Sequence, residues 1–260
     1  MSAVDLHVAQ RRGVLALAGR EARRVVSLWT QTILPPALTA VLFLAVFGGA
    51  LGQRIEAIEG VPYLTFILPG LLVMTVASSA FANASTSLFQ AKNEGYIDDL
   101  LSSPLRGWQI VLGYLPGSLV RSFAAAGVTA AVAAPFADAG YQPALAVAAL
   151  FLTALVFSTL GVITGIWADT FDQHSFVANI VITPLALVGG VFYSARTLDE
   201  PWSTLTRIDP LYYLVDATRA GLTGFHESEV WISLVVAVAT AVAAFTAAAL
   251  LLARGWRLKP

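Results

Sequence analysis

Long apolar runs separated by short polar breaks dominate this chain. An α-helix needs about 20 predominantly apolar residues to cross the hydrocarbon core of a bilayer, and six runs approach or exceed that length. Because backbone polar groups in lipid must be satisfied internally, such runs predict membrane-spanning helices. We therefore predict an all-α integral membrane protein whose six transmembrane helices lie at about residues 32–51, 62–89, 108–136, 143–167, 175–193 and 230–252.

Residues 1–30 form a cytoplasmic or interfacial segment that precedes a single transmembrane domain at 31–260. Between residues 11 and 30, Arg20, Arg24 and Ser27 lie on one side of a predicted helix. A basic amphipathic helix beside a span is typical of the membrane interface. A cytosolic helix packed on a partner is the alternative. The apolar face of this helix comprises Val14, Ala18, Ala22, Val25, Val26 and Trp29.

Composition supports the membrane assignment and removes several kinds of chemistry. Hydrophobic residues make up 57% of the chain and charged residues 12%, whereas soluble domains carry about 25% charged residues. The absence of cysteine excludes disulfides, thiolate zinc sites and thiol nucleophiles. The net charge of −1 gives no indication of a nucleic-acid partner.

The distribution of basic residues predicts the orientation. Six spans place both termini on one side, and cytoplasmic loops carry the excess of lysine and arginine. With the termini inside, Arg54, Arg196, Arg207 and Arg219 lie outside. Ten basic residues then lie inside: Arg11, Arg12, Arg20, Arg23, Arg24, Lys92, Arg106, Arg254, Arg257 and Lys259.

The cytoplasmic break at residues 90–107 has a pattern of its own. After Gly95, the run from Tyr96 to Leu101 predicts a short helix whose acids, Asp98 and Asp99, complement the helix dipole at its start. Ser103 and the proline after it end the helix. A short helix that is acidic on one side and apolar on the other suits docking into a groove of another protein. A solvated connecting loop is the alternative.

The outer break at residues 196–229 contains two helix-start signals. Asp209 is a capping residue followed by Pro210 at the first helical position, and Pro201–Trp202 opens a similar start upstream. The segment from Leu211 to Leu222 is too short to cross a membrane but long enough to dip into it. A surface amphipathic helix is the alternative. Asp216 and Arg219 are three residues apart and can pair, and Tyr193, Trp202, Tyr212 and Tyr213 suit the aromatic belt of a membrane interface.

Arg121 is the one clear charge that this pattern places within a span. A mid-membrane arginine is costly, so it contacts substrate, pairs with another group or snorkels, and the sequence leaves these three roles open. His7, His174 and His226 lack ligand-like spacing, so we expect no metal site, and Asp169 and Asp172 look like ordinary turn residues. No catalytic constellation is apparent.

Nucleotide hydrolysis is not expected of this chain. A phosphate-binding P-loop needs Gly-Lys followed by Ser or Thr. The only lysines, Lys92 and Lys259, follow alanine and leucine. If ATP drives the protein, a separate subunit must bind ATP and magnesium, and this chain itself is expected to bind no cofactor.

Three segments together resemble one family of membrane proteins. They are VPYLTFILPGLL at Val61–Leu72, AKNEGYIDDLLSSPLRGWQIVLGY at Ala91–Tyr114 and GGVFYSARTLDEPWSTLTRIDPLYYLVDATRAG at Gly189–Gly221. Across nearly the whole chain the sequence resembles the permeases of ABC-2 type transporters, especially the YadH-type branch. Asp209 stands where that family commonly has asparagine, which conserves a capping side chain.

The resemblance implies an assembly and roles for the two breaks. Permeases of this family work as homodimers bound to two ATP-binding subunits, and the amphipathic N-terminal helix contacts those subunits. The outer break implies a pair of short re-entrant helices that includes Pro201, Trp202, Asp209, Pro210, Tyr212, Tyr213, Asp216 and Arg219. The contacts that couple the permease to the ATPase are implied to be Glu94, Asp98, Asp99, Leu100, Leu101 and Pro104.

We therefore expect the transmembrane subunit of an ATP-driven exporter of a lipid, glycan or drug-like substrate, multi-pass in a bacterial inner membrane. An ion-coupled transporter or channel is one alternative, and it predicts acids or histidines buried within spans. A non-transporting membrane partner of an ATPase is the other.

Overall fold

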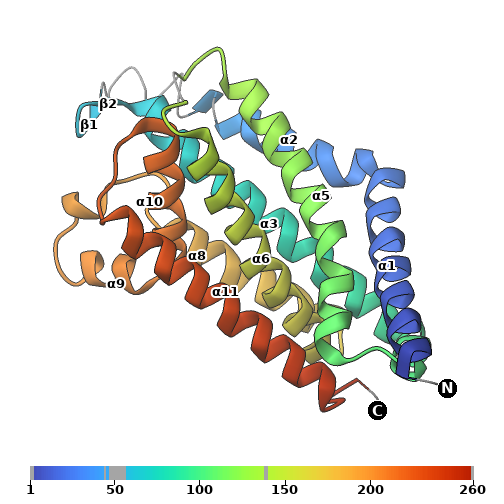
Figure 1. Ribbon diagram of the computed structural model, residues 1–260. Helices are drawn as coiled ribbons and strands as arrows, with labels where there is room; N and C mark the ends of the chain where they lie inside the picture. The colour runs from blue at the N-terminus through green and yellow to red at the C-terminus, as the bar shows by residue number, and fades with distance from the viewer. Residues whose placement is uncertain (1–2, 44, 47–56, 138–139, 259–260) are drawn as a thin grey trace.

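The computed structural model describes residues 3–43, 45–46, 57–137 and 140–258 as a bundle of helices (Figure 1). Part of the predicted first span and of the loop after it lies outside the described residues. The helices are α1 (Ala3–Ser27), α2 (Trp29–Phe43), α3 (Tyr63–Asn93), α4 (Ile97–Ser102), α5 (Gly107–Ala133), α6 (Pro143–Trp167), α7 (Phe171–Phe176), α8 (Thr183–Val188), α9 (Trp202–Ile208), α10 (Pro210–Thr223) and α11 (Val230–Ala253).

The predicted all-helical membrane architecture is confirmed. Helices α3, α5, α6, α11 and the continuous segment Phe171–Val188 are long and apolar enough to cross a membrane. Helices α1 and α2 meet at a bend of 85°, and counting this bent pair as one span gives six. Among the described residues, the only strands are a two-residue hairpin formed by β1 (Ala57–Ile58) and β2 (Val61–Pro62).

Helix α3 is the centre of the bundle and α11 lies at its edge. In their most apolar stretches, 78% of the α3 residues are buried within the chain but only 17% of those of α11. Close packing of α3 on α6 depends on Gly161, since a Cβ added there would lie 2.6 Å from the carbonyl oxygen of Phe81. Small residues of this kind let helices in lipid approach one another, where van der Waals packing drives their association.

The predicted span at 175–193 is shifted and irregular in the structure. It begins as α7 at Phe171, passes through a π-helical segment at Val177–Ile182 and continues as α8 to Val188. Pro184 lies in the first turn of α8 and lacks an N–H group, and Thr183 donates its hydroxyl to the carbonyl of Ala178 at 3.2 Å. Because Pro184 cannot donate a backbone hydrogen bond, the helix is widened into a π-helical segment just before it.

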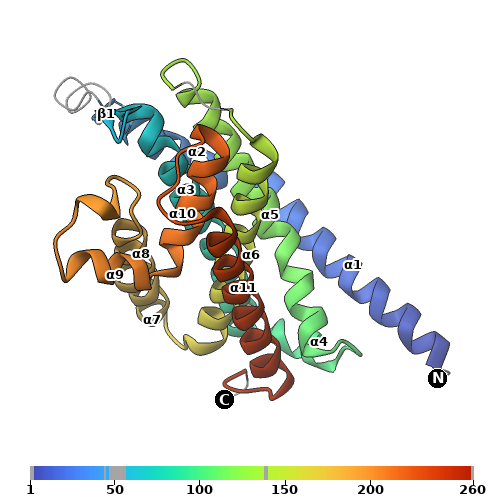
Figure 2. The ribbon, with the colours of Figure 1, turned by 60° about the vertical axis from the view of Figure 1, so that its left-hand side comes forward.

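The start of α1, helix α4 and the end of α11 lie at one end of the molecule, and the β1–β2 hairpin lies at the other (Figures 1 and 2). Helix α1 runs lengthwise along α5 before the chain bends into α2. The two segments predicted to carry function, residues 90–107 and 196–229, are therefore held by different parts of the bundle.

Candidate functional site

Helix α4 is anchored by apolar side chains, of which Ile97 is the most buried and Leu100 and Leu101 pack against the same cluster, and it presents its acids outward. Ile97 is 4% exposed and packs in a core cluster with Leu17, Leu88 and Leu252 from α1, α3 and α11. Asp98 and Asp99 are exposed in the first turn, as predicted. Leu100 and Leu101 are half-buried, while Glu94 and Pro104 are exposed. Docking of this acidic face on a partner stays a prediction.

The segment that follows α4 is tied to two helices by a pair of glutamines. Gln10 donates its amide to the carbonyl of Pro104 at 2.9 Å and accepts from Gln109 at 3.5 Å. Gln109 also accepts the backbone N–H of Arg106 at 2.8 Å, which caps the start of α5. Both glutamines are buried. Movement of α4 is thereby linked to α1 and α5.

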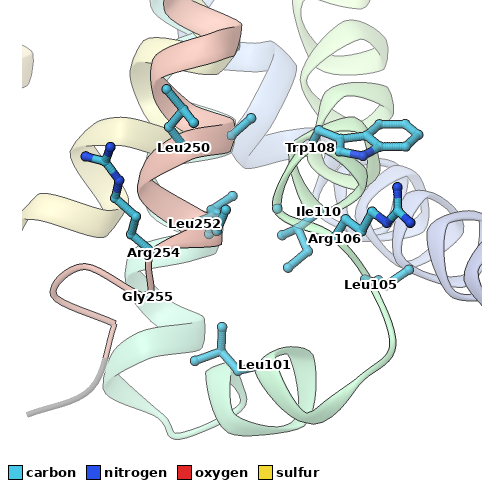
Figure 3. Close-up of a pocket in the computed structure, with 12 residues that line it drawn as sticks. Leu101, Leu105, Arg106, Trp108, Ile110, Leu250, Leu252, Arg254 and Gly255 are labelled. Atoms are coloured by element: carbon cyan, nitrogen blue, oxygen red, sulfur yellow. The ribbon is translucent and has the colours of Figure 1, made fainter.

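An open pocket of about 740 Å³ lies between α4, the start of α5 and the end of α11. Figure 3 shows Leu101 of α4 pointing toward it from below, with Leu252 and Ile110 above. The arginines at its edge are Arg106 and Arg254. An apolar recess with a basic margin beside an acidic helix can receive side chains from a partner.

Asp169 joins α3, α6 and the segment after α11 at the end of the bundle that also carries α4, which the turn interpretation from sequence did not predict. Lys92 at the end of α3 donates to Asp169 at 2.6 Å and to the carbonyl oxygens of Ile166 and Ala168, which end α6. Arg257 near the C-terminus pairs with the same carboxylate. Hydrogen bonds from Lys92 first, and then from Arg257, hold the pKa of Asp169 below its usual value.

A buried polar cluster joins α1 to α3 and α5, and sequence reasoning missed it. Glu21 is 1% exposed and accepts hydrogen bonds from Ser87 at 2.7 Å, Arg20 at 3.1 Å and Arg24 at 3.2 Å. Arg24 also donates to the side chain of Asn83 at 3.0 Å. The sequence analysis named Arg121 as the one clear charge within a span, and it did not predict that α1, outside the predicted spans, brings a second set of charges into the bundle.

The face of α1 that packs on α5 differs from the predicted apolar face. Its buried residues are Gln10, Leu17, Glu21 and Val25, whereas Val26 and Trp29 are exposed. Their spacing of seven and four residues is the sequence signal for this stripe. Two of its four residues, Gln10 and Glu21, are polar, so the sequence did not indicate a buried face here. On α5, glycines lie opposite this stripe: Gly113 packs against Leu17 and Gly117 against Glu21. Placement of α1 in the membrane interface stays a prediction.

Arg121 lies halfway along the 27-residue helix α5, in a groove between α2, α3 and α5. Its Nε is buried without a hydrogen-bond partner, and it forms no ion pair with the described residues. The charged side chain that acts on it is another cation, Arg24. Within the described chain, the pairing role left open by the sequence therefore has no partner.

The three histidines do not meet. His174 is buried against Phe89, and its Nε2 lies 3.0 Å from the hydroxyl oxygen of Ser85. Sequence reasoning gave His174 no role, whereas the structure packs this polar side chain inside the bundle. His226 is exposed in the loop before α11. No group of three potential metal ligands occurs in the parts of the chain that the structure describes.

The predicted start of α10 is confirmed. Asp209 accepts the backbone N–H of Leu211 through Oδ1 at 2.8 Å, and Pro210 occupies the first turn. Ten of the fourteen residues of α10 are buried, so this helix packs inside the bundle and not on its surface, while its entry into the membrane stays a prediction. The second carboxylate oxygen of Asp209 is buried without a hydrogen bond. This burial raises the pKa of Asp209 to about 6.

Arg219 pairs with Glu227 rather than with Asp216. Its guanidinium lies 3.6 Å from a carboxylate oxygen of Glu227, donates to the carbonyl of Gly190 at 2.8 Å and stacks on Phe66 of α3 at 3.9 Å. Asp216 instead accepts the backbone N–H groups of Glu227 and Ser228 and the hydroxyl of Ser233. These contacts connect α10 to α3, to the segment after α8 and to the start of α11.

The aromatic residues predicted for the membrane interface divide into two groups. Trp202 is 61% exposed beside the exposed Pro201, as a membrane-interface side chain requires. Tyr212 is 3% exposed and lies within 3.4 Å of Glu227 and Ser228, so it belongs to the core and not to the predicted belt. Tyr213 and Tyr193 are half-buried.

The sequence of this chain matches a family profile described as ABC-2 type transporter over residues 12–223. It is 36% identical over 209 residues to the inner membrane transport permease YadH of Escherichia coli K12, which covers 80% of this chain and 82% of the relative. The YadH protein of Shigella flexneri matches to the same extent. Nodulation protein J of Rhizobium meliloti is 25% identical over 71% of each chain.

Proposed function

Because this chain belongs to the ABC-2 type transporter family as a transmembrane permease subunit without an ATPase domain, we propose that it exports a lipid, glycan or drug-like substrate. Permeases of this family pair with ATP-binding subunits, so the energy comes from ATP and magnesium held by that partner. We favour export over a passive pore because α4 is a separate helix with an exposed acidic face, which suits docking of a partner, beside the start of α1 and the end of α11.

The observation that carries this proposal is the construction of α4. Ile97 anchors the helix in a core cluster shared by α1, α3, α5, α6 and α11, while Asp98 and Asp99 stay outside. A force on the exposed face is therefore transmitted to several helices at once. Glu94, Leu100, Leu101 and Pro104 complete the face that we assign to coupling, beside the pocket of Figure 3.

The outer segment supplies the opposite gate in this proposal. Helix α10 enters the bundle as a re-entrant helix with α9 packed on its outer side, and the contacts of Arg219 and Asp216 hold α10 against α3 and α11. Nucleotide binding by the partner shifts the population between inward-open and outward-open forms, because it favours one arrangement of α4. The outer helices then open or close as a rigid unit.

The assembly and location that we propose are supported by the same family membership. We propose two copies of the permease with two ATP-binding subunits, in a bacterial inner membrane with both termini in the cytoplasm. The relatives named as inner membrane permeases support the location. Helix α11 exposes Trp231, Val235, Val238 and Val242, and such an apolar surface suits lipid or a second copy.

The coupling assignment is tested by combined substitution of Asp98, Asp99, Leu100 and Leu101 by alanine in the permease reconstituted with its ATP-binding subunit. We expect substrate-stimulated ATP hydrolysis to fall by at least about fivefold, because the coupling free energy between the sites is lost. Membrane insertion is expected to stay intact, because the anchor Ile97 is unchanged.

The matched control neutralises two exposed acids in the outer segment, Asp199→Asn with Glu229→Gln. This variant removes the same number of negative charges and is expected to retain stimulation. Unchanged ATP hydrolysis in the α4 variant would show that residues 90–107 do not couple the two subunits.

A further inference from the structure

The groove around Arg121 has the features of a ligand site rather than of a packing defect. It encloses about 280 Å³ between α2, α3 and α5. Besides the guanidinium, its walls carry four hydroxyl side chains, and the remaining lining is small or apolar. The hydroxyl residues are Thr39, Thr75, Ser78 and Ser79.

Arg121 has no counter-ion among the described residues. Its Nε is buried without a partner, and the nearby acid Glu21 is already occupied by Ser87, Arg20 and Arg24. The neighbouring charge that acts on Arg121 is the positive Arg24. A cation within a bundle in lipid is costly unless something pairs with it. The charge balance of this region therefore calls for an anion from outside the chain.

The hydroxyl groups of Ser78 and Thr39 can turn to donate to a ligand without leaving a buried carbonyl oxygen unpaired. Ser78 donates to the carbonyl of Met74 at 2.7 Å, and Thr39 donates to that of Pro35 at 2.9 Å. The carbonyl of Met74 keeps its helical hydrogen bond when the serine hydroxyl rotates away. A guanidinium beside rotatable hydroxyls matches the oxygens of a phosphate group, which accepts from several donors at once.

We propose that this groove binds the phosphate headgroup of an amphipathic substrate on its way through the permease, an inference that rests on the proposed export function. Arg121 lies about 20 Å along α5 from either helix end at 1.5 Å per residue. Headgroups of resident lipids lie at the two surfaces of a core about 30 Å thick. An anion at this depth is therefore in transit.

The test measures the melting temperature of the purified full chain in neutral maltoside detergent during titration with monododecyl phosphate. Dodecyl glucoside is the uncharged comparison, and inorganic phosphate tests whether the free ion binds without a chain. We expect saturable stabilisation by monododecyl phosphate only. Stabilisation by inorganic phosphate at similar concentrations would assign the groove to a free anion and overturn the amphiphile assignment.

Two substitutions examine the guanidinium. Arg121→Gln should weaken binding at least about tenfold, whereas Arg121→Lys, which keeps the charge, should lose less. Arg23→Gln, at an exposed arginine of α1, is the charge-matched control and should bind as the parent does. Equal binding by Arg121→Gln, or equal stabilisation by dodecyl glucoside, refutes the site.

A third substitution does not depend on removing Arg121. Ser78→Asp places an anion in the same groove, so it should raise the melting temperature and abolish binding of monododecyl phosphate. A lower melting temperature with binding intact overturns the proposal. So does dissociation of a dimer caused by Arg121→Gln, because the counter-ion then comes from a second copy of the chain.

The binding assay contains no ATPase. A failure of coupling in the α4 variant with binding intact would therefore count against the proposed function and not against the groove.

Discussion

Single polar side chains hold this bundle together at its most buried points. Glu21, Asp216 and Arg219 are each at most 1% exposed, and each contacts groups on more than one element. Buried polar groups stabilise a structure only when their hydrogen-bonding capacity is satisfied. Asp209 departs from this rule, since one of its carboxylate oxygens caps α10 and the other is buried without a partner.

Asp209→Asn is expected to stabilise the protein at neutral and alkaline pH. Burial raises the pKa of Asp209 from 3.8 to about 6, so the folded state binds its proton more tightly than the unfolded chain. The stabilising contribution of this group is full below about pH 4 and is lost as the pH rises through 6. Asparagine keeps the capping oxygen without the buried charge, a gain on the order of 2 kcal/mol at pH 8.

Melting temperatures of the purified protein at pH 5 and pH 8 measure this effect. The variant should melt several degrees higher than the parent at pH 8, and the difference should shrink at pH 5. Asp209→Ala is the control that loses the cap and should melt lower than Asp209→Asn at both values, by about 1 kcal/mol of stability. A gain that does not depend on pH would contradict the role of the buried carboxylate.

Helix pairs in this molecule approach closely where a glycine removes the Cβ. Gly161 of α6 faces the backbone of α3 at Phe81, and Gly107 of α5 faces the backbone of α11 at Ala249, where an added Cβ would lie 2.6 and 2.5 Å from the two carbonyl oxygens. Backbone cannot move aside as a side chain can. The contact between the central helix and α6 therefore depends on the absence of a side chain at Gly161 and also at Gly165, where an added Cβ would lie 3.0 Å from the carbonyl oxygen of Ser85.

Gly161→Ala is expected to destabilise the protein by about 1–3 kcal/mol, because α3 and α6 must separate. Gly127→Ala is the matched substitution in α5, where an added Cβ has open space around it. It should stabilise by about 0.5–1 kcal/mol through reduced chain entropy. Thermal melting in detergent distinguishes the two, and equal effects would contradict the close approach.

One end of the molecule carries α4, the start of α1 and the end of α11, and the other end carries the β1–β2 hairpin (Figure 2). The positive-inside rule predicts that the first end is cytoplasmic. The ion-coupled alternative predicts acids or histidines buried within spans. His174 is buried near the start of the segment Phe171–Val188, whereas Glu21 is buried in α1, outside the predicted spans. Glu21, however, is occupied by two arginines and a serine. Family membership identifies the chain as an ABC-2 permease.

The absence of cysteine makes the orientation directly measurable. Ser102→Cys lies on exposed α4 and Thr204→Cys on exposed α9. A membrane-impermeant maleimide should label Thr204→Cys in intact cells and Ser102→Cys only after the membrane is permeabilised. Labelling of both in denatured protein serves as the control. The reverse pattern in intact cells would place α4 outside and refute the coupling proposal.

Periodicity and composition were sufficient for the helical membrane architecture, for the limits of α6 and for the cap that starts α10. These features depend on interactions within one segment or on the length of an apolar run, so they can be derived without knowing what packs where. The acidic start of α4 is local in the same sense, because Asp98 and Asp99 lie in the turn that their own sequence forms.

Long-range packing settled the rest. Glu21 and Lys92 find partners 66 and 77 residues away, and Arg219 contacts the backbone of Phe66 153 residues away. The pairing predicted for Arg219 from spacing failed, because Asp216 binds backbone N–H groups that only the folded loop brings to it. Sequence spacing allows several partners for a buried charged side chain. The packing of the helices decides which of these partners the side chain contacts.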